Sequence, residues 1–161
     1  MAVSGVEFDR SMRTLIRGSN GIRTIIFPDM LRTIRQAAFS HVKSLRKAAL
    51  NEGLKVLGTD ETAPNGRLYL EVFCSSGLRS VVLPSTLKKI WSYAFAYCAD
   101  LKTVRFPEGL EYIGVGCFYK TGLESAEFPA SIRTISQASF SECENLNAVR
   151  FAEGLEVLGT D

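Results

Sequence analysis

The chain has 161 residues, of which 46% are hydrophobic and 22% are charged, and its formal net charge is +2. This composition is typical of a folded globular domain and argues against a disordered chain. No apolar run approaches the roughly 20 residues of a membrane helix, the start lacks the apolar core of a secretory signal, and the low net charge makes bulk attraction to nucleic acid weak.

One pattern recurs along the whole chain. Residues 78–100, 101–122 and 123–145 share the frame L-x-x-V/A-x-L/F-P-x-x-L/I-x-x-I-x-x-x-x-F, and residues 22–44 fit it with Ile22 and Ile25 at its first two apolar positions. We number the repeats as coils 1 to 7; coil 1 is degenerate, coil 3 carries an inserted loop at 58–72, and coil 7 is incomplete. In chain order their bounds are 3–21, 22–44, 45–77, 78–100, 101–122, 123–145 and 146–161.

Each coil begins with a short strand pattern. In coil 4, Leu78, Val81 and Leu83 face inward, Pro84 ends the strand, and Phe95 fills the back of the coil. One coil cannot bury its apolar face alone, whereas stacked coils bury it continuously. The sequence therefore predicts one domain over residues 1–161, an α/β-type but mostly β repeat solenoid. We expect it to be right-handed, with about seven coils, a parallel sheet on one side and irregular or short helical turns opposite.

Three recurring columns identify the repeat more closely. A Pro follows the strand, a Phe recurs near the end of the frame, and a Cys stands three residues after two of the Phe residues. The members are Pro28, Pro84, Pro107 and Pro129; Phe39, Phe73, Phe95, Phe118 and Phe140; Cys98 and Cys143. This pattern resembles the BspA-like leucine-rich repeat family, a cysteine-bearing branch with repeats of about 23 residues, although Val42 and Thr121 stand where a Cys would fall. The resemblance implies a leucine-rich-repeat solenoid and a role in protein interaction or adhesion.

A second, longer period lies above the coils. Residues 22–60 and 123–161 align without gaps at an offset of 101, with 18 identities in 39 positions. We interpret the chain as a segment, or a near relative, of a longer array built from four-coil units.

Charge is divided unevenly along the chain. Residues 1–89 carry +7 and residues 90–161 carry −5. The second position of successive coils is basic and then turns acidic: Arg23, Arg46, Arg79, Lys102 and finally Glu124. Stacked coils would place these side chains in one outward column, which predicts an anionic partner, either a sulfated glycan or an acidic protein patch. The alternative is a solvated face whose long side chains splay apart.

Aromatic residues gather in coils 4 and 5. Trp91, Tyr93 and Tyr97 occupy outward positions of coil 4, and Tyr112 and Tyr119 fall in coil 5. Tyrosine and tryptophan bury a large area at a small cost in entropy, so these residues are a second candidate for partner binding. The alternative is that the inserted loop of coil 3 folds onto them.

Residues for catalysis are absent from the sequence pattern. His41 has no Cys, Asp or Glu at metal-ligand spacing, and the chain contains no phosphate-binding loop or nucleophile elbow. The four cysteines are predicted to be reduced packing residues. We therefore expect no enzyme activity, no metal and no cofactor. Free thiols suit a reducing compartment, whereas members of the resembled family are often displayed at the cell surface, so the compartment stays open.

The sequence thus predicts a non-enzymatic protein-interaction or adhesion module that presents a repeat surface to a protein or glycan. The alternative is a structural spacer within a longer repeat protein, with no ligand of its own. Nucleic acid is not expected as a partner, because no aromatic residues interleave with the basic column. Coil 7 shows no polar cap, so we also expect self-association through residues 146–161, or fraying there in a monomer.

Overall fold

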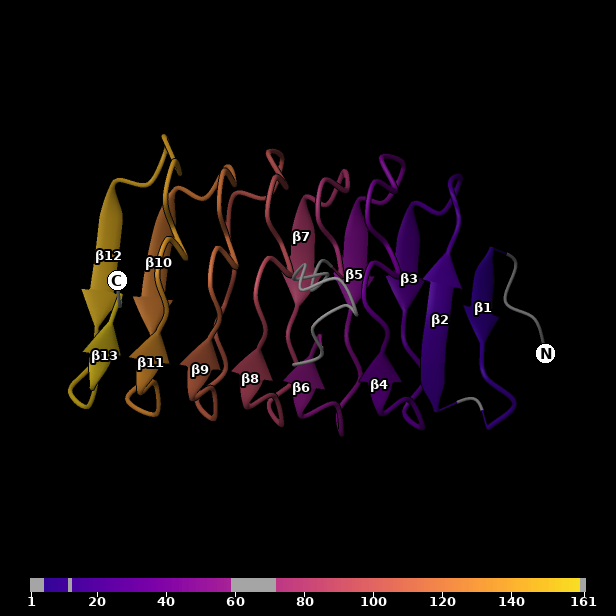
Figure 1. The fold of residues 1–161 in the computed structure, drawn as a ribbon, viewed down its shortest axis with the longest axis horizontal. Helices are drawn as coiled ribbons and strands as arrows, with labels where there is room; N and C mark the ends of the chain where they lie inside the picture. The colour runs from indigo at the N-terminus through magenta and orange to yellow at the C-terminus, as the bar shows by residue number, and fades with distance from the viewer. Residues whose placement is uncertain (1–4, 12, 59–71, 160–161) are drawn as a thin grey trace, which may run out of the picture.

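The computed structural model describes residues 5–11, 13–58 and 72–159, so the predicted insertion of coil 3 lies almost entirely outside the described residues. The described residues form a stack of flattened turns with short strands on both sides and no helix (Figure 1). The strands are β1 Val6–Phe8, β2 Thr14–Gly18, β3 Thr24–Ile26, β4 Thr33–Ile34, β5 Lys47–Ala49, β6 Val56–Leu57, β7 Ser80–Val82, β8 Lys89–Ile90, β9 Tyr112–Ile113, β10 Ser125–Phe128, β11 Thr134–Ile135, β12 Ala148–Phe151 and β13 Val157–Leu158.

The first strand of each coil belongs to what we call the first ladder. Here β3, β5 and β7 pair in parallel, and β10 pairs in parallel with β12. Between these two groups, residues 101–107 of coil 5 form no strand, so the first ladder is interrupted. Alternation sets the burial within the ladder, because Ile25, Ala48 and Val81 lie in register and face the core.

From coil 3 onward the second strand of each coil belongs to the second ladder, on the other side of the turns, whereas β4 of coil 2 pairs with β2. Its five strands run without interruption in the order β13-β11-β9-β8-β6, all parallel. The inward residues of its central strands, Ile90, Ile113 and Ile135, are buried and lie in register. The prediction of a mostly β parallel solenoid is confirmed, and the sheet structure occupies two sides of it.

The core follows the predicted phenylalanine column. Phe39, Phe73, Phe95 and Phe118 are fully buried, and their rings stack coil on coil with centroids 5.2–5.4 Å apart. Phe140 continues the column at 5.2 Å from Phe118 and is partly exposed. Each ring therefore covers the next, as the repeat pattern requires.

Coil 1 differs from its prediction. Instead of a parallel coil, β1 and β2 form an antiparallel hairpin, and β2 then pairs in parallel with β4. The carboxylate of Asp9 accepts hydrogen bonds from the backbone N–H groups of Arg13 (3.2 Å) and Thr14 (3.1 Å), which closes the tight turn between the two strands. Six parallel turns follow this hairpin, one fewer than the seven predicted coils.

The turns around the phenylalanine column are not helical in the described residues. Tyr93 and Tyr97, two residues on either side of Phe95, have φ values of 53° and 59°. The same left-handed positions recur in coils 2, 5 and 6 at Ala37, His41, Gly116, Lys120, Ala138 and Glu142. A left-handed residue in every fourth position ends a right-handed helix before it can form a full turn, so the alternative of short helical turns was wrong here.

Candidate interaction surface

The predicted basic column is present at the start of the first ladder. The backbone N–H of Arg46 donates to Arg23 O at 2.7 Å, and that of Arg79 donates to Arg46 O at 2.9 Å, so the three residues follow one another across the coils. The side chain of Arg46, however, is turned back to the protein. Its Nη1 donates to the carbonyls of Lys43 and Gly77 (3.0 Å for Gly77), so Arg46 holds adjoining backbone in place.

Two other members of the column have acidic neighbours. Arg79 Nε lies 3.6 Å from Asp100 Oδ2, and Lys102 Nζ lies 3.0 Å from Glu124 Oε1. Both pairs are well exposed, so they reduce the local charge without contributing much stability. The column is therefore less basic at its coil 5 end than the sequence predicts.

An apolar stripe, which the sequence analysis did not single out, runs parallel to the basic column. Ile26, Ala49 and Val82 are direct neighbours in the register of β3, β5 and β7. Ile26 is 78% exposed and Val82 62% exposed, and Ala49 between them is half-buried. The stripe could have been predicted from the sequence, because residues 25–27 (I-I-F) and 81–83 (V-V-L) place an apolar residue on the outward as well as the inward face.

The stripe leads into a hollow where the first ladder is interrupted. The hollow has a volume of about 660 Å³ and lies between β7 and residues 105–108. Val82 and Leu83 line one side, Phe106 and Pro107 the other, and Arg105 borders it. The stripe and this hollow form one continuous surface, because Val82 belongs to both.

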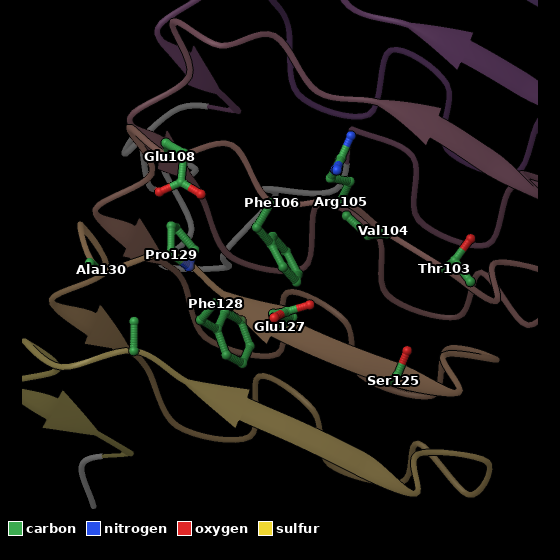
Figure 2. Close-up of a pocket in the computed structure, with 11 residues that line it drawn as sticks. Thr103, Val104, Arg105, Phe106, Glu108, Ser125, Glu127, Phe128, Pro129 and Ala130 are labelled. Atoms are coloured by element: carbon green, nitrogen blue, oxygen red, sulfur yellow. The ribbon is translucent and has the colours of Figure 1, made fainter.

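A second hollow of about 600 Å³ lies on the other side of the same segment, toward β10 (Figure 2). Its lining includes Arg105, Glu108 and Glu127, and the rings of Phe106 and Phe128 lie side by side beneath it with centroids 4.9 Å apart. Arg105 thus lines both hollows, and residues 103–106 run between them.

A hydrogen-bonded contact between coils is missing beside the second hollow. Between coils 3 and 4, the Glu52 carboxylate accepts hydrogen bonds from Ser85 N (3.0 Å) and Ser85 Oγ (2.8 Å), and these bonds lower the pKa of Glu52. Between coils 5 and 6, Glu108 is the counterpart of Glu52, and Ala130, which has no hydroxyl, stands where Ser85 would be. Both Glu108 and Ala130 line the second hollow.

Four of the five aromatic residues of coils 4 and 5 form two separate pairs, and Tyr93 packs against a glycine. Trp91 and Tyr112 lie with ring centroids 5.2 Å apart, and Tyr97 and Tyr119 lie 5.3 Å apart in an edge-to-face arrangement. The ring of Tyr93 packs against Gly116, where an added Cβ would meet its Cε1 at 2.4 Å. Each of these contacts joins coil 4 to coil 5.

Charged side chains contact the Tyr97–Tyr119 pair. Lys120 Nζ lies 5.3 Å from the ring centroid of Tyr119 and 6.0 Å from that of Tyr97, and it pairs with Glu142 at 2.9 Å. The Tyr119 hydroxyl donates to the same carboxylate, which raises the pKa of Tyr119 and lowers that of Glu142. This pair is therefore internally bonded, which makes it a weaker candidate for partner binding than the apolar stripe.

All four cysteines are buried, as packing residues would be, and Cys98, Cys117 and Cys143 are free thiols. The structure explains the trailing cysteine column, because each thiol donates to the carbonyl of a Phe one coil earlier. Cys98 Sγ lies 3.1 Å from Phe73 O, and Cys143 Sγ lies 3.0 Å from Phe118 O. Burial raises the pKa of Cys98 to about 12 and that of Cys117 well above its ordinary value.

Cys98 and Cys117 are expected to resist Ellman's reagent in the native chain at about pH 8.5, where an ordinary thiol is half ionised, and to react once denatured. An added surface thiol, Ser141→Cys, is the accessible control, since Ser141 is exposed. Native modification of Cys98 as fast as that of Ser141→Cys would contradict the prediction.

The buried thiols also make stability depend on pH. Because the unfolded chain loses the thiol protons at a lower pH than the folded chain does, the contribution of these thiols to stability is intact below about pH 9 and declines as the pH rises toward 12.

The described ranges contain no group of three or more His, Cys, Asp or Glu residues that could hold a metal ion. They also contain no helix that is long and apolar enough to cross a membrane. His41 is exposed in a turn with a φ of 60°.

One protein family matches most of the chain. The sequence model described as "BspA type Leucine rich repeat region" matches residues 15–61 and 67–161 in six copies. No curated protein matches the chain significantly.

Solved structures of low identity share the fold. A leucine-rich repeat protein of T. pallidum matches with a TM-score of 0.71 and 22% identity, over 94% of this chain and 71% of that one. One from Bacteroides ovatus matches with a TM-score of 0.75 and 18% identity, over 99% and 43%. A "leucine rich cell surface protein" from Faecalibacterium prausnitzii matches with a TM-score of 0.75 and 23% identity, over 88% and 35%. The chain thus spans less than half the length of the last two.

Proposed function

The chain belongs to the BspA-type leucine-rich repeat family, and from this premise we propose that it is a non-enzymatic interaction module for a protein partner. The observation that carries the proposal is the apolar stripe of Ile26, Ala49 and Val82, together with the hollow that it enters. A regular outward sheet face with two strongly exposed aliphatic side chains in one row is typical of a binding surface. The cell-surface description of the F. prausnitzii protein supports adhesion as the setting.

The chemistry of the surface indicates an acidic protein with an apolar centre. Arg23, Lys47 and Arg79 are exposed beside the stripe, so a partner would meet an apolar middle with a cationic border. Burial of aliphatic side chains supplies affinity, while the bordering charges select the partner and raise the association rate. A sulfated glycan would use the cations and leave the stripe uncovered, so the stripe favours a protein.

The test uses a phage-displayed library of random peptides as one probe and heparin as the other. We expect selected peptides to combine acidic and large apolar residues. We expect Val82→Glu or Arg79→Glu to weaken their binding at least tenfold, about 1.4 kcal/mol. Arg46 is left unchanged in this test, because its guanidinium supports the backbone.

Arg150→Glu is the matched control, because Arg150 is exposed on the same ladder in coil 7 and the substitution changes the net charge as Arg79→Glu does. If Arg150→Glu and Arg79→Glu lowered the peptide affinity equally, the effect would be due to net charge alone, and the proposed binding surface would be refuted. Binding to heparin that depends on Arg79 but not on Val82 would reassign the surface to a glycan.

One observation favours the spacer as a second candidate. Four exposed ion pairs join one coil to the next, and they offset much of the surface charge: Lys88–Glu111, Lys102–Glu124, Lys120–Glu142 and Arg133–Glu156. A spacer predicts that no peptide is selected and that the variants behave as the parent chain does.

A further inference from the structure

The backbone hydrogen bonds of the first ladder stop at coil 4. Phe27 N donates to Ala49 O of the next coil, and Leu50 N donates to Val82 O of the next, both at 3.0 Å. The equivalent donor in coil 4 is Leu83 N, for which the described residues provide no acceptor. In the interior of the stack, β7 is therefore an edge strand (Figure 1).

The unpaired edge continues along β7. Ser80 bonds back to coil 3, because its N–H donates to Arg46 O at 3.2 Å. Backbone groups point to alternate sides along a parallel strand, so the N–H and C=O of Val81 point to coil 5. Neither group has a partner in the described part of the chain. The edge therefore presents a donor, an acceptor and a second donor in a row, from Val81 N–H to Leu83 N–H.

These unpaired groups belong to buried residues that border a cavity. Val81 is 7% exposed and Leu83 8% exposed, and a buried backbone group without a partner destabilises a protein. Both residues line the hollow of about 660 Å³ between β7 and residues 105–108, called here the first hollow. Across it, residues 103–106 make no backbone hydrogen bond to any described residue. The first hollow thus combines an open strand edge with a volume typical of binding sites.

We infer that the partner binds here through an extended segment, which pairs with the edge of β7 as an added strand. Its carbonyl groups accept hydrogen bonds from the N–H groups of Val81 and Leu83, and one of its own N–H groups donates to Val81 O. A carboxylate alone fits less well, because it accepts hydrogen bonds and donates none. About five residues, at about 3.3 Å each, cover the edge over residues 79–83. The inference rests on the proposed function and specifies the form in which the partner binds.

The side chains around the edge specify the segment further. Val82 points outward and is 62% exposed, so an aliphatic residue of the added strand would extend the apolar stripe beside it. Arg79 begins the edge and Arg105 borders the hollow, whereas Glu52 and Glu108 line it beyond the strand-ending prolines. We therefore expect an acidic residue where the segment passes Arg79, and a neutral or basic residue at its other end.

Amide hydrogen exchange of the full chain tests the open edge without any ligand. We expect Leu83 N–H to exchange at least tenfold faster than Leu50 N–H, the equivalent donor of coil 3, which is bonded to Val82 O. Equal protection of the two amides would overturn the inference, because coil 5 would then close the ladder in solution.

The probe for binding is an acidic and apolar peptide selected from the phage library. At saturation we expect it to slow the exchange of Val81 and Leu83 at least tenfold and to leave Phe106 unchanged. Phe106 N–H is the matched control, because it is the equivalent unpaired donor of coil 5 and points to coil 6, on the side of the second hollow. A peptide that binds without protecting Val81 and Leu83 would overturn the inference.

Backbone changes in the peptide separate the inference from the proposed function. Single N-methyl groups remove one N–H at a time and leave every side chain in place. We expect them to lower the affinity at least tenfold at alternate residues, where the N–H faces β7, and less at the residues between. If the peptide binds and all N-methyl variants bind equally well, the added strand is refuted and the interaction module stands. If no peptide is selected, the proposed function fails and the inference fails with it.

Discussion

Replacing Phe95 with alanine is expected to lower the free energy of unfolding by about 3–5 kcal/mol, the usual range for a buried phenylalanine. Its ring is fully buried and stacks between Phe73 at 5.4 Å and Phe118 at 5.2 Å. The cavity would therefore open at the middle of the column, where two neighbouring coils lose a contact together. Urea unfolding followed by circular dichroism measures the change.

Phe151→Ala is the matched control. Phe151 stacks on Phe128 at 5.2 Å but is 46% exposed in coil 7, so its replacement is expected to cost only about 1 kcal/mol. A loss for Phe95→Ala as small as that for Phe151→Ala would show that the stacked column does not hold the coils together.

The repeating frame made the buried part of the fold predictable. Apolar residues recur in each coil at the positions of Leu78, Val81 and Phe95, and that spacing determines which side of the coil each one faces. The hairpin of coil 1 was not predictable in the same way, because it depends on the bonds of Asp9 to the backbone of its own turn. The interruption at residues 101–107 was not predictable either, because coil 5 keeps the apolar positions and the proline of the frame there.

The candidate surface was predictable in its position and less so in its chemistry. The basic column lies on the ladder where the frame places it, but the pattern could not tell that Arg46 folds back onto Gly77. The stripe beside it was predictable from Ile26 and Val82, which are apolar residues at outward positions of β3 and β7. The hollow could not be predicted, since it lies where coil 5 contributes no strand to the first ladder although coils 4 and 6 do.

The turn that leaves coil 5 also departs from its neighbours. Five positions separate Phe118 from Leu123, whereas six separate Phe95 from Leu101, so coil 5 is one residue shorter at this turn. The shorter path brings Gly122 close to the preceding coil, where its N–H lies 3.4 Å from Cys98 O. Glycine is required for this approach because the backbone of one coil contacts the backbone of the next.

Gly122→Ala is therefore expected to destabilise the chain by about 1–3 kcal/mol or more. The added Cβ would lie 2.2 Å from Ala99 O, a backbone atom that cannot move without shifting the coil. Gly109→Ala in the same coil is the control, because its Cβ would be 3.2 Å from Ser85 O and would otherwise meet the flexible Lys88 side chain. We expect that change to stay within about 1 kcal/mol, since alanine also lowers the entropy of the unfolded chain. Equal midpoints in urea for the two variants would refute the close approach at Gly122.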